Sequence, residues 1–398
     1  MPVPTPDRPP QRPARPPHSP DLLVIGGGIV GLSVALFAAR EGLAVALIDP
    51  RPFGSASTAR SGALIRTHYD SEVEARLALA GLTLFESFSE LIGGESPFTP
   101  TGFAYVPTVE EVVDGRFRAR VAMLAGCGID TEILDAAGLS EIDLNLDISD
   151  VGVVAYEPRS GFADPALTTA GLAAAARRAG TQLRLGVAAT GLIESGGRVI
   201  GADTTAGPVF AGAVCVCAGV RSRALCAGVG LDLPLTPTVI ALLTVPRAVP
   251  GHLSVIDAAG GIYFRPDPPQ QTIVGRRAFD DVVLDAPDDE PEPPDWSFMD
   301  AALPALQRRL PSAIGAPVIA RRAGQLDMTP DGRPLLGPTA LPGLWLSCGW
   351  SGTGFKTGPS AGQQLARWLV TGSAPDRDLE AFCIERVPEP ARGPRSPH

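Results

Sequence analysis

Residues 21–49 read DLLVIGGGIVGLSVALFAAREGLAVALID, and this stretch decides the fold class. Its apolar run Leu22–Ile25 predicts a short buried strand, which three glycines at 26–28 then interrupt. A helix is expected over 29–40 and a second strand over 43–48. The stretch therefore predicts a β-α-β unit, which is typical of an α/β protein.

The glycines of this unit have the spacing G-x-G-x-x-G at Gly26, Gly28 and Gly31, and the second strand ends at Asp49. The first glycine suits a tight turn, the second lets a pyrophosphate approach the backbone, and the third packs the helix against the strand. The helix that begins with Ile29 and Val30 would direct its N-terminus at the phosphates. Asp49 would accept hydrogen bonds from a ribose, and an acid there disfavours the extra phosphate of NADP. A purely structural glycine turn is the alternative, but the complete pattern favours dinucleotide binding.

The composition restricts the class of protein. The 398 residues include 45 glycines, 41 prolines and 45% hydrophobic residues, which suits two or three globular folding units with many tight loops. The formal charge of −10 argues against nucleic acid as a partner, because phosphate binding needs clustered positive charge. The six cysteines and four histidines fit no metal-ligand spacing, so we expect no metal. Of the 33 basic residues, only Lys356 is a lysine.

The N-terminal end resembles a targeting segment. Residues 1–20 are rich in proline and arginine and predict a disordered tail, and the uncharged stretch 22–39 follows. A basic tail before an apolar stretch also fits a signal peptide or a membrane helix. Three consecutive glycines make a poor membrane span, so we expect no membrane contact and a cytoplasmic location.

The rest of the chain alternates between helical and strand patterns. A capping box at Ser71 and Glu74 predicts a helix that ends at Gly93 and Gly94. Further helices are expected over 110–125, 165–179, 298–310 and 359–370, and strands over 102–106, 183–187, 198–202, 213–217, 239–245, 261–265, 272–275 and 344–348. An acidic, proline-rich loop is expected at 280–295, and a glycine-rich loop at 349–358.

Four motifs carry a resemblance to a known family: residues 21–49, SGALIRTHY at 61–69, AGQLDMTPDGRPLLGPT at 323–339, and GWSGTGFKTGP at 349–359. With them, the chain resembles the flavin-dependent amine and amino-acid oxidases of the D-amino-acid oxidase superfamily. It looks nearest to the branch of sarcosine oxidase, dimethylglycine dehydrogenase and glycine oxidase. The resemblance covers roughly residues 20–385.

The resemblance implies an α/β fold, with a Rossmann-type FAD-binding domain interleaved with a mixed-sheet α+β substrate domain. The FAD-binding domain is expected over 20–75, 148–235 and 320–385, and the substrate domain over 76–147 and 236–319. Residues 1–20 and 386–398 are expected as disordered tails.

The resemblance also implies the residues that bind FAD. The ADP half would lie against Gly26, Gly28, Ile29, Val30, Gly31 and Asp49. Further contacts are expected from Ser57, Ser61 and Gly62, from the backbone of Ala189, and from Ala218 and Gly219. The loop Gly352, Thr353, Gly354, Phe355 and Lys356 would lie against the flavin ring, where its amides and lysine would stabilise negative charge.

For catalysis, the resemblance implies that Arg66 and Lys356 hold the substrate carboxylate and that Tyr263 and Phe264 border the substrate cavity. Alternatives remain for each of these residues. Arg66 would otherwise pair with a flavin phosphate or an acidic side chain, Lys356 would be a solvated surface lysine, and Tyr263 would be a core aromatic.

The sequence departs from the family pattern at two positions. Gly324 stands where monomeric sarcosine oxidase carries the cysteine that attaches its flavin, so FAD is expected to bind non-covalently here. Ile273 stands where the same oxidases place a lysine that speeds reaction with oxygen. Arg276 and Arg277 would compensate in an oxidase that uses molecular oxygen, whereas a dehydrogenase would pass the electrons to another acceptor.

The resemblance therefore implies oxidation of a C–N bond in a small carboxylate-bearing amine, either an amino acid or an N-alkyl amino acid, by hydride transfer to flavin. Two alternatives stay open. The chain would otherwise be the flavoprotein subunit of a multi-subunit dehydrogenase complex, or a flavin hydroxylase. A homo-oligomer and a hetero-oligomer are both compatible with these expectations.

Overall fold

The computed structural model describes residues 19–249, 251–276 and 296–387. Most of the expected N-terminal tail, the acidic loop at 280–295, Arg277 and residues 388–398 lie outside these ranges. Arg386, expected in the C-terminal tail, lies instead in the 3-10 helix Ile384–Arg386. Among the described residues, none of the helices is both long enough and apolar enough to span a membrane.

A six-stranded sheet contains the β-α-β unit, in the order β19-β20-β13-β1-β2-β9. Its strands are β1 (Leu22–Ile25), β2 (Val45–Asp49), β9 (Gln182–Leu185), β13 (Ala213–Val216), β19 (Leu335–Pro338) and β20 (Leu344–Cys348). All neighbours are parallel except β19 and β20. Every residue of β1 is buried, as a central strand with both faces covered requires.

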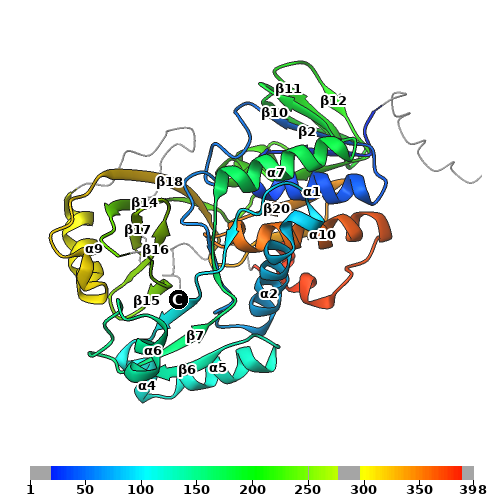
Figure 1. Cartoon of the computed structure of the whole chain (residues 1–398). Helices are drawn as coiled ribbons and strands as arrows, with labels where there is room; N and C mark the ends of the chain where they lie inside the picture. Colours follow the sequence, from blue (N-terminus) through cyan, green and yellow to red (C-terminus); the bar gives the residue numbers. More distant parts are fainter. Residues whose placement is uncertain (1–18, 250, 277–295, 388–398) are drawn as a thin grey trace, which may run out of the picture.

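Three helices pack beside one another against this sheet: α1 (Ile29–Arg40), α7 (Pro165–Arg178) and α10 (Gly354–Thr371) (Figure 1). Glycines let α10 lie close to α1. A Cβ on Gly358 would lie 2.8 Å from Cγ2 of Val30, and one on Gly362 would lie 2.8 Å from Cβ of Ser33. These glycines remove side chains from the contact between the two helices.

The same glycines explain an incorrect prediction. The expected loop 349–358 is helical from Gly354 onward, so α10 begins five residues before the predicted start at Pro359. Gly354 and Gly358 suggested a flexible loop, but each is a close-packing position, because a Cβ on Gly354 would lie 2.9 Å from the side chain of Trp350. The correction places Lys356 in the first turn of a helix.

The second large sheet has eight strands, in the order β18-β14-β17-β16-β15-β5-β7-β6. They are β5 (Phe103–Val106), β6 (Glu132–Asp135), β7 (Val153–Glu157), β14 (Thr236–Pro246), β15 (Ser254–Asp257), β16 (Ile262–Asp267), β17 (Gln271–Arg276) and β18 (Ala320–Met328). The β15–β5 pair is parallel and the others are antiparallel, so the sheet is mixed. Helix α9 (Trp296–Arg309) packs on one face of the sheet, where Phe264 and Val274 belong to a buried core (Figure 1).

The remaining strands form two small antiparallel sheets. One has the order β3 (Leu64–Ile65), β8 (Gly161–Ala163) and β4 (Phe98–Thr99). The other has the order β10 (Ala189–Ser195), β11 (Arg198–Thr204) and β12 (Val209–Phe210). The remaining α-helices are α2 (Glu72–Glu86), α3 (Phe88–Leu91), α4 (Val109–Val113), α5 (Arg116–Gly126), α6 (Ala136–Ile142) and α8 (Ser222–Ala227).

Two expected long helices are interrupted. The helix expected to run from Ser71 to Gly93 breaks at Ser87, between α2 and α3. The helix expected over 110–125 divides into α4 and α5, because Gly115 between them has a φ of +82°, which no helix interior accommodates.

The α/β architecture with a parallel and a mixed sheet matches the expected fold class. The proposed division of the chain at 148 and 320 remains a prediction. Strands β7 and β18 fall in segments expected in the FAD-binding domain, but both hydrogen-bond within the eight-stranded sheet.

Candidate active site

A cavity of about 1480 Å³ lies between the two large sheets and is lined by the glycine turn at one end and by Arg66, Tyr69 and Lys356. Pockets for small ligands are usually 300–1,000 Å³. The volume therefore accommodates a long ligand together with a smaller one.

The glycine turn has no room for side chains. Gly26 has a φ of +111°, and a Cβ on it would lie 2.3 Å from the backbone O of Cys217. Gly28 lines the cavity, whereas Gly31 does not. A Cβ on Gly31 would lie 1.9 Å from the backbone O of Gly26, so Gly31 lets helix α1 approach the turn, as its place in the motif predicts.

Asp49 and Thr58 organise the backbone around this turn. Asp49 accepts hydrogen bonds from the backbone N of Gly27 at 2.7 Å and of Arg51 at 2.8 Å. The Oγ1 of Thr58 accepts a hydrogen bond from the backbone N of Ile29 at 3.1 Å, at the start of α1. Thr58 lies between Ser57 and Ser61, in a turn where the resemblance implies contacts with FAD, but the resemblance did not single out Thr58 itself.

Most residues expected to bind the cofactor line this one cavity. They are Gly26, Gly28, Ile29, Val30, Asp49, Ser57, Ser61, Gly62, Ala189, Ala218, Gly219, Gly352, Thr353, Gly354, Phe355 and Lys356. They come from segments up to 330 residues apart in the sequence, so the fold brings them together; their roles remain predictions.

The turn before α10 is fixed by a buried carboxylate. Asp327, on β18, accepts a hydrogen bond from the backbone N of Gly349 at 2.6 Å, and its own backbone O accepts one from the N of Ser351. Burial raises the pKa of Asp327 to about 6, against the lowering effect of the backbone N–H groups of Gly349, Trp350 and Asp327 itself. Asp327 lines the cavity and lies within the motif at 323–339, but the motif alone does not indicate that this carboxylate holds the turn.

Arg66 and Lys356 meet at one aromatic ring. The guanidinium carbon of Arg66 lies 4.6 Å from the centroid of the Tyr69 ring, and Nζ of Lys356 lies 5.8 Å from the same centroid. Lys356 is only 7% exposed, so it is not a solvated surface lysine. Within the described part of the chain, neither cation has a carboxylate partner at ion-pair distance.

The electrostatics of Lys356 follow from this placement. Burial lowers its pKa well below the usual range, and the charge of Arg66 lowers it further. Glu74, on α2, opposes this shift. A buried cation beside another cation is costly, and an anion that enters the cavity relieves that cost.

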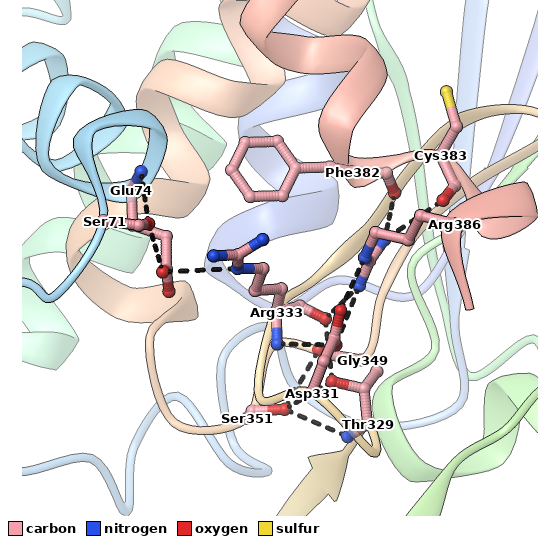
Figure 2. Close-up of polar contacts among 10 residues, drawn as sticks. All are labelled: Ser71, Glu74, Thr329, Asp331, Arg333, Gly349, Ser351, Phe382, Cys383 and Arg386. Atoms are coloured by element: carbon pink, nitrogen blue, oxygen red, sulfur yellow. Dashed lines mark hydrogen bonds and ion pairs between the residues drawn. The ribbon is translucent and has the colours of Figure 1, made fainter. Parts of the chain in front are cut away.

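Glu74 is engaged by other groups (Figure 2). It accepts a hydrogen bond from Oγ of Ser71 at 2.6 Å, and Nε of Arg333 lies 3.4 Å from it. Arg386 stabilises the turn that carries Arg333, because its Nε lies 2.8 Å from Oδ2 of Asp331 in the same turn. The C-terminal segment of the described chain therefore supports one wall of the cavity.

Tyr263 and Phe264 point to opposite faces of the eight-stranded sheet. Tyr263 lines the cavity, and its ring lies against the backbone of Gly62 and Gly275, where a Cβ would come within 2.8 and 2.4 Å of it. Phe264 is fully buried in the core beneath α9, and its ring is tilted against that of His252 with the centroids 5.5 Å apart. The expectation that Phe264 borders the cavity is therefore wrong, because successive side chains of a strand alternate between its faces.

Gly324 and Ile273 both lie outside the cavity lining, whereas Arg276 lines it. A Cβ on Gly324 would lie 2.8 Å from Cβ of Arg60, so Arg60 occupies the space that a cysteine there would need. Ile273 is 1% exposed and pairs across the sheet with Arg265. Among the described residues, no group of His, Cys, Asp and Glu is arranged to hold a metal ion.

Residues 21–368 match the family model for FAD dependent oxidoreductases. The chain belongs to this family. The expected membership of the D-amino-acid oxidase superfamily is thereby confirmed. The expected cofactor, FAD, is confirmed with it.

Similar proteins agree with this family. The chain is 26% identical to human sarcosine dehydrogenase over 94% of its own length, but it spans only 42% of the length of that protein. It is 25% identical to the beta subunit of sarcosine oxidase from an Arthrobacter species, over 93% of this chain and 92% of the subunit. The structure of L-proline dehydrogenase from P. horikoshii superposes with a TM-score of 0.85 at 24% identity, over 93% of this chain and 98% of that chain, and shows the same fold.

The residues of the cavity fit FAD. The glycine turn leaves no Cβ between the cavity and the backbone, and the cavity continues from there to the first turn of α10. Several buried polar atoms in the lining have no hydrogen-bond partner among the residues that the structure describes: Nε of Arg51, the hydroxyl of Tyr69, Oγ of Ser347 and Nε1 of Trp350. Buried polar atoms are normally paired, so these atoms indicate that polar ligands belong in the cavity.

Proposed function

We propose that this protein oxidises the C–N bond of a small amine that bears a carboxylate, with non-covalently bound FAD as the cofactor. The substrate class would be amino acids or N-alkyl amino acids. The observation that carries the proposal is the pair of buried cations, Arg66 and Lys356, which flank Tyr69 in the cavity and have no carboxylate partner of their own among the described residues.

The two cations would bind the substrate carboxylate. Arg66 offers a planar set of donors that matches a carboxylate, and Lys356 adds a second positive charge. Tyr69 would hold both side chains in place and, through its unpaired hydroxyl, donate a further hydrogen bond. Binding through the carboxylate fixes the orientation of the α-carbon, which converts a bimolecular encounter into a positioned one.

FAD, when bound, supplies an acceptor for the hydride that leaves the α-carbon. The N–H groups of Gly354 and Phe355 lie in the first turn of α10, where no carbonyl of the same helix is available to them, and both residues line the cavity. They would stabilise negative charge on the bound cofactor. The reaction requires a neutral substrate amine but no dedicated protein base, and water then hydrolyses the imine product.

The residue at the position of the flavin-linking cysteine supports non-covalent binding of FAD, because Gly324 provides no thiol and Arg60 fills the space beside it. Ile273 carries no charge and lies outside the cavity, which favours a dehydrogenase. Arg276 does line the cavity and is the cation that would compensate in an oxidase. We expect reduced enzyme to reoxidise slowly in air, and rapid reoxidation would instead support an oxidase.

A second candidate function is that of the flavoprotein subunit of a larger complex. The similarity to the beta subunit of a sarcosine oxidase over 92% of that subunit favours it. Gel filtration of the protein, alone and with the products of neighbouring genes, distinguishes the two. A self-sufficient monomer that turns over substrate would exclude the complex.

Anaerobic mixing tests the proposed function. The purified holoprotein is mixed with N-methyl, cyclic and primary amino acids and with the corresponding amines that lack a carboxylate. Bleaching of the flavin by at least one carboxylate-bearing amine, and not by its decarboxylated counterpart, is the expected result. Bleaching by the decarboxylated amines alone would contradict the proposed substrate class.

A further inference from the structure

Segment 66–69 carries three of the cavity residues, Arg66, His68 and Tyr69, yet it belongs to neither a helix nor a strand. It connects β3 to α2. A connecting segment orients its side chains reproducibly only where other groups hold it. The groups that hold this segment come from the eight-stranded sheet.

Glu157, the last residue of β7, is 1% exposed and does not line the cavity. Its Oε2 accepts hydrogen bonds from the backbone N of Thr67 at 2.9 Å and from Oγ of Ser160 at 2.7 Å. Its Oε1 lies 3.7 Å from Nδ1 of His68. One buried carboxylate thus contacts two consecutive residues of the segment.

The charge of Glu157 is stabilised by these contacts. Burial by itself raises the pKa of a carboxyl group, but His68, the Thr67 N–H and the Ser160 hydroxyl together lower the pKa of Glu157 below its usual range. The side chain is therefore ionised at neutral pH. It places a negative charge behind the segment that presents Arg66 and Tyr69 to the cavity.

His68 is the second anchor of the segment. Its backbone O accepts a hydrogen bond from Nη1 of Arg66, which fixes one end of the guanidinium. Its ring stacks on Tyr105 with centroids 4.2 Å apart, and Nε2 lies 3.5 Å from Nη1 of Arg120. Burial lowers the pKa of His68, and the charges of Arg120 and Arg66 lower it further, while Glu157 opposes the shift.

The wall behind His68 is also fixed. Arg120 lies 2.6 Å from Oε1 of Glu111 and 2.6 Å from Oδ1 of Asp70, and Tyr105 donates a hydrogen bond to Glu111 at 3.0 Å. The ring of His68 therefore packs against side chains whose positions are set by charged partners.

We propose that Glu157 is a positioning residue for Arg66. Through the Thr67 N–H and His68 it orders the segment so that the remaining N–H groups of Arg66 face the substrate carboxylate, and it touches neither substrate nor cofactor. The proposal rests on the proposed function, because it concerns the recognition of a carboxylate.

A purely structural role for Glu157 predicts a different outcome from a positioning role. A structural role affects the stability of the whole protein and all ligands alike. If Glu157 positions Arg66, its substitution weakens the binding of only those ligands that carry a carboxylate. The substitution then has no effect on binding when Arg66 is already absent.

The experiment titrates oxidised holoprotein with benzoate and, separately, with its neutral counterpart benzamide, and follows the flavin absorption. Glu157→Gln keeps the shape of the side chain and removes its charge, and Arg66→Gln and the double variant complete a cycle. We expect Glu157→Gln to weaken benzoate binding about tenfold or more, to leave benzamide unchanged, and to have no further effect when combined with Arg66→Gln. Glu157→Asp, which restores the charge, is expected to recover part of the affinity.

Asp143→Asn is the matched control, because Asp143 is also a buried carboxylate of this part of the molecule and accepts a backbone hydrogen bond from Leu253 at 2.8 Å. It does not line the cavity, so benzoate binding should be unchanged. An equal loss in this control, or an equal loss from Glu157→Gln with and without Arg66, overturns the positioning role.

If the Glu157 variants do not fold, Ser160→Ala decides the question, because it removes one hydrogen bond to the same carboxylate. A loss of benzoate affinity of about threefold supports the proposal, and unchanged affinity contradicts it.

The wild type and Arg66→Gln are compared first. If Arg66→Gln does not weaken benzoate binding, the proposed function fails, whereas an effect of Arg66→Gln without one of Glu157 refutes only the positioning role.

Discussion

Arg66 and Lys356 face the same aromatic ring, with the guanidinium carbon 4.6 Å and the ammonium nitrogen 5.8 Å from the centroid of Tyr69. The ring stabilises both cations where burial disfavours them. It also holds two positive charges near each other without a carboxylate of the protein between them, in the part of the chain that the structure describes. The site is therefore complementary to an anion that comes from outside.

Removal of either cation should weaken the binding of carboxylate ligands. Lys356→Met and Arg66→Gln are each expected to cost roughly 2–5 kcal/mol, as loss of a buried charged partner usually does. Titration of the flavin absorption with a carboxylate and with its neutral amide measures the effect. Arg116→Gln is the control, because Arg116 is exposed, pairs with Asp114 and does not line the cavity. Equal affinities for the carboxylate in wild type and both cation variants would contradict a role of Arg66 and Lys356 in carboxylate binding.

The lowered pKa of Lys356 predicts a pH dependence of carboxylate binding. Burial and Arg66 favour the neutral amine, and Glu74 favours the ammonium. Lys356 therefore loses its proton below the usual range of a lysine, and affinity should fall as pH rises through that lowered pKa. Carboxylate affinity measured at pH values up to the usual pKa of a lysine should show this decrease in wild type. Lys356→Met should lack the decrease, and the same slope in both proteins would argue against Lys356 as its origin.

Gly31 is predicted to be required for the cofactor turn although it does not touch the cavity. Gly31→Ala places a Cβ 1.9 Å from the backbone O of Gly26, so α1 must move away from the turn. We expect the purified variant to lose most of its FAD and to unfold at a lower temperature. Gly126→Ala is the matched control, because Gly126 ends α5 with no atom within 4 Å of an added Cβ. Retention of full FAD content by Gly31→Ala would show that the turn tolerates the displacement.

The sequence predicted the β-α-β unit closely, because its strand, glycine and helix signals are all local. Helix α1 has the expected bounds, and Gly26 and Gly31 make the close contacts that their spacing implies. The start of α10 could not be predicted in this way. Gly354 and Gly358 resemble loop residues in the sequence, and only their packing against Trp350 and Val30 explains them.

The site was predictable where a motif marks it and not elsewhere. Arg66 and Lys356 were expected at the substrate carboxylate, and the structure brings both to one ring, although their function remains a proposal. Glu157 lies outside the four motifs and Asp327 lies within one, but the sequence indicates the role of neither, because each acts through a backbone N–H of a segment that is distant in the sequence. Such partners become visible only when the two large sheets are assembled.

Asp327 should make stability depend on pH in a distinctive direction. Its pKa is raised by burial to about 6, above the value of an unfolded aspartate, so the folded state binds the proton more tightly. This group therefore makes the protein less stable as pH rises from about 4 to about 6, with no further change above that. Asp327→Asn keeps an acceptor for the Gly349 N–H and removes the titration.

The difference in Tm between Asp327→Asn and wild type isolates this effect from other titrating groups. We expect the variant to gain stability relative to wild type between pH 4 and pH 6.5, by about 1–3 kcal/mol. Thermal unfolding at fixed FAD concentration measures it. A difference in Tm that stays constant across this range would show that Asp327 titrates alike in the folded and unfolded states.

The structure predicts that the flavin is not linked covalently to the protein at Gly324. The space beside Gly324 is filled by Arg60, whose Cβ would lie 2.8 Å from an added Cβ, and Gly324 itself does not reach the cavity. We therefore expect acid precipitation of the yellow holoprotein to release intact FAD into the supernatant. Gly324→Cys should not create a covalent link, because its side chain meets Arg60 before it reaches the cavity. Flavin that stays with the precipitated wild-type protein would require an attachment site elsewhere in the chain, and peptide mapping of the yellow pellet would locate it.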